Sequence, residues 1–340
     1  MGDTSKHLTY FKVENFKRFE SFEMKDLGQF NLIVGDNNTG KTSVLEALLI
    51  NEDLHQTIYD LLKALEYRNL ISEFLYNDLQ LYKNVKSDKS KNSISVEYRL
   101  RGNDERGLID LSFDMSRQML VLRLKHDSAQ PSKSEANLYT KSTFPYFYAS
   151  FIPFYQGHDE DLTRFYSRLQ EDRSLKNNFI KNLKVIVPEL ENIEPTHQFE
   201  KPHLIVYQNH INQTIPLAFF GDGVLKLFRI LAAININKGR RLMVDEVDTG
   251  IHFSRFKEFW KTVLLAAKEN DVQLFMTTHN KECIKYFKEV LEDELPNLRT
   301  EARSITLIEN PKKEIKAFTY TFDQLQASVE FGNEVRGGAR

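Results

Sequence analysis

The sequence contains a single cysteine, Cys283, which rules out an intrachain disulfide framework and is typical of a reducing compartment. No apolar run approaches the roughly 18 residues of a membrane-spanning helix, and the N-terminal sequence MGDTSKH lacks the apolar stretch of a signal peptide. Neither charge is in excess, because 46 Lys and Arg stand against 48 Asp and Glu. No global field would therefore draw the chain to nucleic acid or to an anionic membrane. We expect a cytoplasmic protein without membrane attachment.

Apolar residues make up 41% of the sequence and aromatic residues 12%, which is enough for a sizeable core. Before residue 145 the apolar periodicity predicts three strands, one long helical region and an antiparallel meander. The strands cover 8–13, 19–24 and 30–34, the helical region covers 53–83, and the meander covers 94–100, 108–113 and 119–124. The polar segment 125–143 predicts a mobile stretch, and the aromatic segment 145–155 predicts a buried strand that leaves its sheet at Pro153.

The rest of the sequence alternates helices with short apolar strands. Two helices are expected over 159–184, and strand-like segments follow to about 215. Further along, helices at 224–236, 252–268 and 281–291 alternate with strands at 242–244 and 272–276, and a strand pair at 305–309 and 316–320 closes the pattern. Such alternation indicates an α/β fold with a parallel core.

Residues 35–42 read GDNNTGKT, a complete Walker A phosphate loop between a strand-like run and a helical run. Its glycines let backbone N–H groups point at phosphate oxygens, and the loop ends at a helix N-terminus, which favours an anion. Lys41 would contact the β- and γ-phosphates, and the Thr42 hydroxyl would ligate Mg²⁺. A glycine-rich turn without a ligand is the alternative. The predicted ATP site comprises Gly35, Asp36, Asn37, Asn38, Thr39, Gly40, Lys41, Thr42 and Ser43.

An apolar run ending in Asp245-Glu246 follows the Walker B pattern, in which the aspartate supports Mg²⁺. Glu246 directly after it can polarise an attacking water, which favours hydrolysis over transfer to a substrate hydroxyl. A second apolar run, 272–278, delivers His279 at its end, where an imidazole could hydrogen-bond the γ-phosphate or the water. We predict Lys41, Glu246 and His279 as catalytic residues, although a structural histidine is the alternative for His279.

Gly221, Asp222 and Gly223 open a helix about twenty residues before the Walker B run. Two glycines at a helix N-terminus make a second anion-binding nest, and an ordinary helix cap is the alternative. Since the phosphate loop of one chain already cradles its own phosphates, a second nest suggests that nucleotide is clamped between two chains.

In order along the chain, these motifs resemble the ABC-class ATPase head of SMC-type, RecF-type and OLD-family (overcoming-lysogenisation-defect) proteins. The likeness covers roughly 8–50 and 145–335, and it rests on five stretches: 13–19 (VENFKRF), 35–42, 220–223 (FGDG), 245–252 (DEVDTGIH) and 277–280 (TTHN). The resemblance implies that two heads sandwich two ATP–Mg²⁺, with each 221–223 segment closing over the partner's nucleotide. It also implies that Arg18 contacts nucleotide and that Gln156 is a metal ligand, unless Gln156 is a surface glutamine.

The expected architecture is a P-loop NTPase of mixed α/β sheet with flanking helices. One ABC-type head would span 1–340, built from 1–52 and 145–340, with a helical and antiparallel insertion at 53–144. No heptad repeat is sustained and no Toprim nuclease region follows the closing strands, so a separate effector such as a nuclease is expected in genome defence or DNA maintenance. The expected assembly is a homodimer or higher homo-oligomer. Lys83, Lys86, Lys89, Lys91 and Arg101 could contact nucleic acid, with a solvated loop as the alternative.

Three rival functions remain at this point. A small-molecule or nucleotide kinase would need an acceptor pocket and a mobile lid, and both Asp245-Glu246 and His279 argue against it. A GTPase would carry an Asn-Lys-x-Asp motif, which the sequence 280–283 (NKEC) lacks. A scaffold that uses ATP only to assemble is disfavoured by Glu246.

Overall fold

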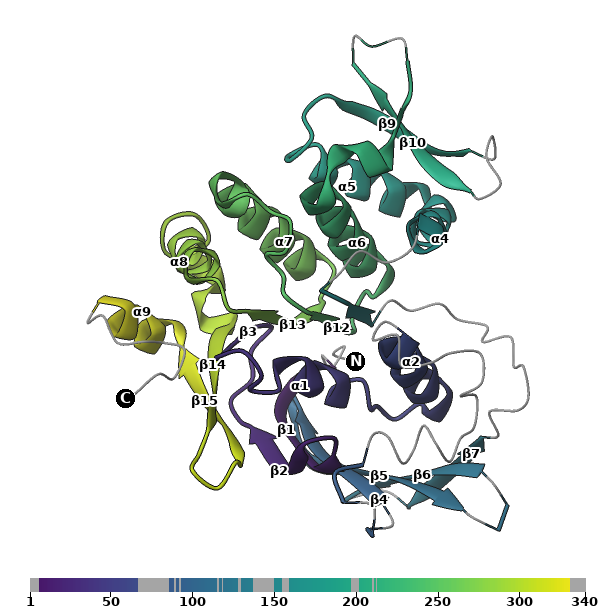
Figure 1. Ribbon diagram of the computed structural model, residues 1–340, viewed down its shortest axis with the longest axis vertical. Coiled ribbons are helices and arrows are strands. Elements are labelled where there is room, and N and C mark those ends of the chain that lie inside the picture. Colours follow the sequence, from purple (N-terminus) through teal and green to yellow (C-terminus); the bar gives the residue numbers. More distant parts are fainter. Residues whose placement is uncertain are drawn as a thin grey trace. The chain divides into compact units, whose positions relative to one another are not determined.

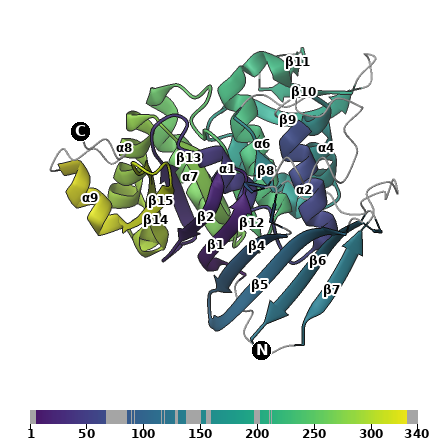
Figure 2. The same cartoon turned by 60° about the horizontal axis from the view of Figure 1, so that its bottom comes forward.

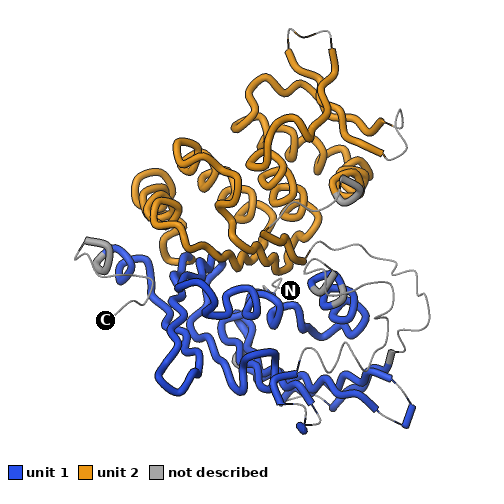
Figure 3. The backbone as a smooth tube through the Cα atoms, viewed as in Figure 1, with its two compact units in different colours: residues 1–147, 302–340 blue, residues 148–301 orange. Residues whose placement is uncertain are grey.

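The computed structural model describes residues 6–66 and 86–330, apart from positions 89, 92, 115, 118, 128–129, 137–149, 155–158, 197–201, 210 and 212. The chain divides into two compact units (Figure 3). Unit 1 consists of residues 1–147 and 302–340, and unit 2 consists of residues 148–301. Each unit has its own strands, helices and buried side chains.

The elements of unit 1 are β1 (Leu8–Phe16), β2 (Phe19–Met24), β3 (Phe30–Val34), α1 (Lys41–Ala47), α2 (Leu54–Glu66), β4 (Ser93–Leu100), β5 (Asn103–Asp114), β6 (Met119–His126), β7 (Ser132–Ala136), β14 (Ala302–Glu309), β15 (Ile315–Thr321) and α9 (Phe322–Glu330). An antiparallel sheet has the strand order β2-β1-β4-β5-β6-β7, and its strands fan out side by side in Figure 2. In a second group, β14 lies parallel to β3 and antiparallel to β15. All five residues of β3 are buried, as expected for a strand in a parallel arrangement covered on both faces.

The elements of unit 2 are β8 (Phe151–Ile152), α4 (Asp159–Gln170), α5 (Arg173–Leu183), β9 (Leu190–Thr196), β10 (His203–Gln208), β11 (Ile215–Pro216), η1 (Leu217–Phe220), α6 (Asp222–Ile236), β12 (Arg241–Val244), η2 (Phe253–Arg255), α7 (Phe256–Glu269), β13 (Gln273–Thr278), α8 (Lys281–Glu289), η3 (Val290–Glu294) and η4 (Pro296–Glu301). Strand β12 runs parallel to both β13 and β8. The short strands β9, β10 and β11 form a separate antiparallel group.

Helix α6 is the centre of unit 2, and α4, α5 and α7 pack around it (Figure 1). Every residue from Leu225 to Asn235 is buried. A largely apolar helix that is buried on all sides needs other elements to cover it on all sides. Two aromatic side chains, Phe179 of α5 and Phe228 of α6, meet edge to face with ring centroids 4.8 Å apart. This contact packs α5 against the first half of α6.

Most elements predicted from the sequence are confirmed. The strands within 8–34, the antiparallel meander, the two helices over 159–184 and the closing strand pair all form. Of the predicted helical region 53–83, helix α2 forms the described part, which ends at Glu66. Residues 67–83 lie outside the described residues. Of the strand predicted at 145–155, the described part is Phe151–Ile152.

Two predictions were wrong in detail. The segment 125–143 was predicted to be mobile, yet β7 pairs with β6 at Ser132–Ala136. Its sequence SKSEA has no apolar alternation because this strand is paired through its backbone while its side chains are largely solvated. The helix predicted from residue 252 begins as the 3₁₀ turn η2 and becomes α-helical only at Phe256.

The segment predicted as an insertion, 53–144, shares its sheet with the N-terminal strands. Strand β4 pairs antiparallel with β1, for example Val96 opposite Val13, and β5 to β7 continue from β4. The organisation as one head built from 1–52 and 145–340 stays a prediction.

Candidate nucleotide site

The phosphate loop of unit 1 joins the end of β3 to the start of α1. The Lys41 side chain is only 8% exposed, and its Nζ donates hydrogen bonds of 2.9 Å to the carbonyl oxygens of Gly35 and Asp36. Thr39 Oγ1 also donates to the Asp36 carbonyl, at 2.9 Å. These bonds fold the loop around the ammonium group, so that a cation lies at the centre of a ring of backbone.

Arg18 lies over this loop. Its guanidinium donates to the Asn38 carbonyl and forms an ion pair with Glu309, with 2.8 Å between Nη2 and Oε2. A Cβ added at Gly40 would come within 2.9 Å of Arg18 Cδ, and Gly40 has a φ of +88°. Glycine at this position therefore provides both the left-handed backbone and the room for the arginine stem. The structure places Arg18, predicted from the resemblance alone, against the phosphate loop.

In unit 2, the acidic pair follows directly after β12. Asp245 is 2% exposed, and its N–H donates to the Ile152 carbonyl of the neighbouring strand β8 at 2.8 Å. Glu246 has a φ of +42°, a conformation that non-glycine residues rarely adopt. Its side chain is about a third exposed, while that of Asp245 is buried. The two carboxylates therefore point into different environments, although they are adjacent in sequence.

His279 follows β13, the parallel neighbour of β12. Its Nδ1 lies 3.4 Å from Glu246 Oε1, and both side chains are partly exposed. Because the carboxyl ends of parallel strands meet at one edge of a sheet, the register that pairs Val244 with Met276 brings the two residues together. The structure thus places a carboxylate and an imidazole side by side, within reach of solvent.

Lys226 of α6 connects three segments of unit 2. Its Nζ donates to the carbonyl oxygens of Pro153, at 2.5 Å, and Asp245, at 2.8 Å. The side chain is 4% exposed, and this burial lowers the pKa of Lys226 to about 7, against the partly compensating attraction of Asp245. Lys226 therefore ties the start of α6 to the backbone of the acidic pair and to the end of β8.

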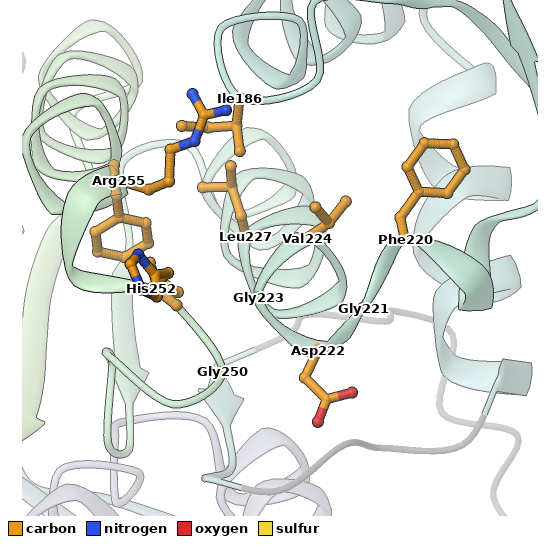
Figure 4. A pocket seen from close by; sticks show the side chains of 12 residues that line it. Ile186, Phe220, Gly221, Asp222, Gly223, Val224, Leu227, Gly250, His252 and Arg255 are labelled. Atoms are coloured by element: carbon orange, nitrogen blue, oxygen red, sulfur yellow. The ribbon is translucent and has the colours of Figure 1, made fainter.

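The segment 221–223 lies against the turn that follows the acidic pair (Figure 4). A Cβ added at Gly223 would meet the Gly250 carbonyl at 2.5 Å, and one added at Gly250 would meet Asp222 Cβ at 2.7 Å. A hollow of about 260 Å³ opens beside this contact, bordered by Phe220, Leu227, His252 and Arg255 among others. Gly221 caps α6 without a side chain and has a φ of +81°. The prediction that 221–223 is a helix N-terminus is confirmed.

The remaining predicted site residues fall in two groups. Asp36, Asn37 and Asn38 are exposed at the tip of the phosphate loop, and Thr42 and Ser43 lie in the first turn of α1. Gln156 lies outside the described residues. Among the described residues, no cluster of three or more His, Cys, Asp and Glu side chains is arranged to hold a metal ion.

Sequence reasoning missed three residues that shape the site: Lys226, Thr277 and Glu309. Lys226 had a visible signal, because it is a charged residue in a largely apolar helical run. Thr277 lies two residues before His279 in the stretch 277–280, but its own role could not be predicted, since it depends on hydrogen bonds to the segment that follows another strand. Glu309 ends a predicted strand that lies 291 positions from Arg18, its ion-pair partner.

A phosphate loop with a buried lysine, an acidic pair ending a parallel strand and a glycine-bounded helix start define a P-loop ATPase, of the ABC class of ATPase heads. The chain belongs to the family described as "AAA domain, putative AbiEii toxin, Type IV TA system", whose model matches residues 30–284. In fold it is similar to an SMC head crystallised with the C-winged helix domain of ScpA. The TM-score is 0.51 and the identity 10%, over 94% of this chain and 99% of that one.

Two relatives are similar in sequence. An ATP/GTP phosphatase of Helicobacter pylori is 25% identical over 336 residues, covering 83% of this chain and 88% of the relative. An uncharacterized protein of Methanocaldococcus jannaschii is 25% identical over 208 residues, covering 56% of this chain and 90% of the relative. No helix in the described part of the chain is both long and apolar enough to cross a membrane.

Proposed function

We propose that the protein binds ATP with Mg²⁺ and that Glu246 activates water for hydrolysis, with His279 as its partner. The observation that carries this proposal is the 3.4 Å approach of His279 Nδ1 to Glu246 Oε1 at the ends of paired strands. Glu246 accepts the proton of the attacking water, and His279 holds the carboxylate in place or hydrogen-bonds the phosphate. Both side chains are open to solvent, so that water can reach them.

Nucleotide is bound by the phosphate loop. Lys41 already lies inside the loop, where phosphate oxygens would replace the carbonyls of Gly35 and Asp36 as its partners. Arg18 adds a second cation at the loop surface. The hydroxyl of Thr42 and the carboxylate of Asp245 are the hard oxygen ligands that Mg²⁺ prefers, and the bound ion would neutralise phosphate charge.

The test of hydrolysis is phosphate release by purified protein without any acceptor. Glu246→Gln should bind ATP as tightly as wild type, because the amide preserves shape, but should lose turnover since it cannot accept a proton. Lys41→Ala should lose ATP binding in calorimetry. Unchanged turnover in Glu246→Gln would refute the role of Glu246, and phosphate transfer that needs an added hydroxyl acceptor would favour a kinase. GTP should be compared, since the H. pylori relative is named for both nucleotides.

The segment 221–223 completes the site of a second copy in this proposal. Gly221 is the position to test, because an added Cβ there meets no atom within 4 Å, whereas a Cβ at Gly223 would strike Gly250. Gly221→Gln and Lys41→Ala should each be inactive alone. In a mixed dimer, one site combines the intact phosphate loop of the Gly221 variant with the intact 221–223 segment of the Lys41 variant. Random mixing makes half the dimers mixed, so roughly a quarter of wild-type activity should return if the sites act independently.

The control for this mixing experiment is Gly239→Gln. Gly239 also has a positive φ, +69°, with no atom within 4 Å of an added Cβ, but it lies away from the helix start. It should keep its ATPase activity. No recovery in the mixture of Gly221→Gln and Lys41→Ala, with mixed dimers demonstrated by two affinity tags, would refute sharing of the site between chains.

We further propose that the ATP-bound dimer gates a separately encoded effector, such as a nuclease, in genome defence or DNA maintenance. The family's description, which names a putative toxin of a type IV TA system, supports a role in genome defence. Glu246→Gln with ATP should retain the effector in a pull-down from the native host, and Lys41→Ala should not. Equal retention by both variants would refute gating by ATP.

A further inference from the structure

Thr277, the residue before the last of β13, contacts the acidic pair through one atom. Its Oγ1 donates a hydrogen bond to Asp245 Oδ1 at 2.6 Å and accepts one from the Glu246 N–H at 2.8 Å. Its own carbonyl accepts from the Val247 N–H at 2.9 Å. Thr277 is fully buried. One residue of β13 is therefore bonded to three consecutive residues after β12.

These bonds hold the backbone at Glu246, the residue whose backbone conformation is least favourable in this segment. Glu246 has a φ of +42°, and a non-glycine residue stays in this region only when its surroundings hold it there. The N–H of this same residue, Glu246, donates the hydrogen bond to Thr277 Oγ1. Without that acceptor the part-buried N–H would lose its partner, and the peptide could rotate towards an ordinary conformation.

The chemistry of the hydroxyl suits both bonds at once. A hydroxyl has one hydrogen and two lone pairs, so the group that accepts from Glu246 can donate to Asp245. Serine can make the same two bonds, whereas valine has the shape of threonine and can make neither. The neighbouring Thr278 donates to Asp248 Oδ1 at 2.6 Å, so the next part of the turn is held by a separate hydroxyl.

We propose that Thr277 is a positioning residue for ATP hydrolysis, which holds the Glu246 carboxylate beside His279. This inference rests on the proposed role of Glu246. Thr277 touches neither nucleotide nor water in this scheme, and it acts through the backbone of Glu246.

The test compares Thr277→Val with Thr277→Ser. Thr277→Val should lower kcat by about 10- to 100-fold, because a displacement of roughly 1 Å at a reacting group costs up to that much. Its dissociation constant for ATP, measured by calorimetry in the absence of Mg²⁺, should stay within about threefold, since the phosphate loop is untouched. Thr277→Ser should recover kcat to within about threefold of wild type. A Thr277→Val enzyme with wild-type kcat would overturn the proposal.

Two controls separate positioning from general destabilisation. Thr262→Val removes a buried hydroxyl from α7 of the same unit and should leave kcat unchanged. In a Glu246→Gln background, Thr277→Val should change the residual rate by less than about threefold, because both changes act through one group. A further tenfold loss there would show that Thr277 acts by another route.

Folding is checked by circular dichroism, with Thr277→Ala as a second variant that avoids any misfit of the valine methyl group. If neither Thr277→Val nor Thr277→Ala is folded at the assay temperature, the hydroxyl is structural and the proposal fails. The proposed function fails separately, namely if Glu246→Gln itself turns over ATP at the wild-type rate.

Discussion

Replacing Gly250 by alanine tests whether the turn after the acidic pair is packed on the start of α6. Two costs combine at this position. The φ of +77° costs a side chain roughly 1–2 kcal/mol, and the added Cβ would lie 2.7 Å from Asp222 Cβ and 2.9 Å from Gly223 N. Overpacking of this kind costs roughly 1–3 kcal/mol, because backbone has to move. The free energy of unfolding of unit 2 should therefore fall by about 2–5 kcal/mol in Gly250→Ala.

Gly239→Ala isolates the packing cost. Gly239 has a similar φ of +69°, but an added Cβ meets no atom within 4 Å, so only the conformational cost of roughly 1–2 kcal/mol applies. Urea unfolding of both variants, followed by tryptophan fluorescence of Trp260 in α7, gives the difference at constant m-value. We expect Gly250→Ala to be less stable than Gly239→Ala by about 1–3 kcal/mol. A difference below roughly 0.5 kcal/mol would refute the close contact between 221–223 and Gly250.

Three further outcomes are expected. Because burial lowers the pKa of Lys226 to about 7, against about 10.4 in an unfolded chain, the unfolded state binds the extra proton between these values. The free energy of unfolding, measured with urea, should then rise by about 2 kcal/mol between pH 7 and pH 9 in the wild type, and by less in Lys226→Met. Parallel pH profiles of the two proteins would contradict this. Glu309→Gln should release Arg18 from its ion pair and thereby tighten ATP binding several-fold in calorimetry. Weaker binding would mean that Glu309 holds Arg18 in place for the nucleotide. Burial raises the pKa of the Cys283 thiol, so an aromatic disulfide reagent should label it only on unfolding, and rapid labelling of native protein would contradict its burial.

The elements and the phosphate loop could be predicted because their signals are local. The run FNLIV of β3 is apolar throughout, and the spacing of Gly35, Gly40 and Lys41 is complete within eight residues. The support of the acidic pair could not be predicted in this way. The bond from Thr277 to Asp245 spans 32 positions and exists because β12 and β13 pair in one particular register, which no periodicity encodes.

Edge strands were the other weak point of sequence reasoning. The strand Ser132–Ala136 has no alternation of apolar and polar residues, since its stability comes from backbone bonds to β6. Lys226 is an intermediate case. Its helix was predicted, and the lysine was visible in an apolar run, but its two carbonyl partners belong to segments 73 and 19 positions away.

The pairing of β14 with β3 has a consequence for how the chain folds during synthesis. Phe30 lies opposite Ala302, so the strand that leads into the phosphate loop acquires this neighbour only after about 270 further residues have been made. Unit 2 is continuous from 148 to 301 and contains both β12 and β13, so its contacts can form as it leaves the ribosome. Contacts this distant in sequence form slowly, because a long loop must close first. We therefore expect the Walker B half to fold before the phosphate-loop half, which would keep the nascent chain unable to bind nucleotide until β14 has been made.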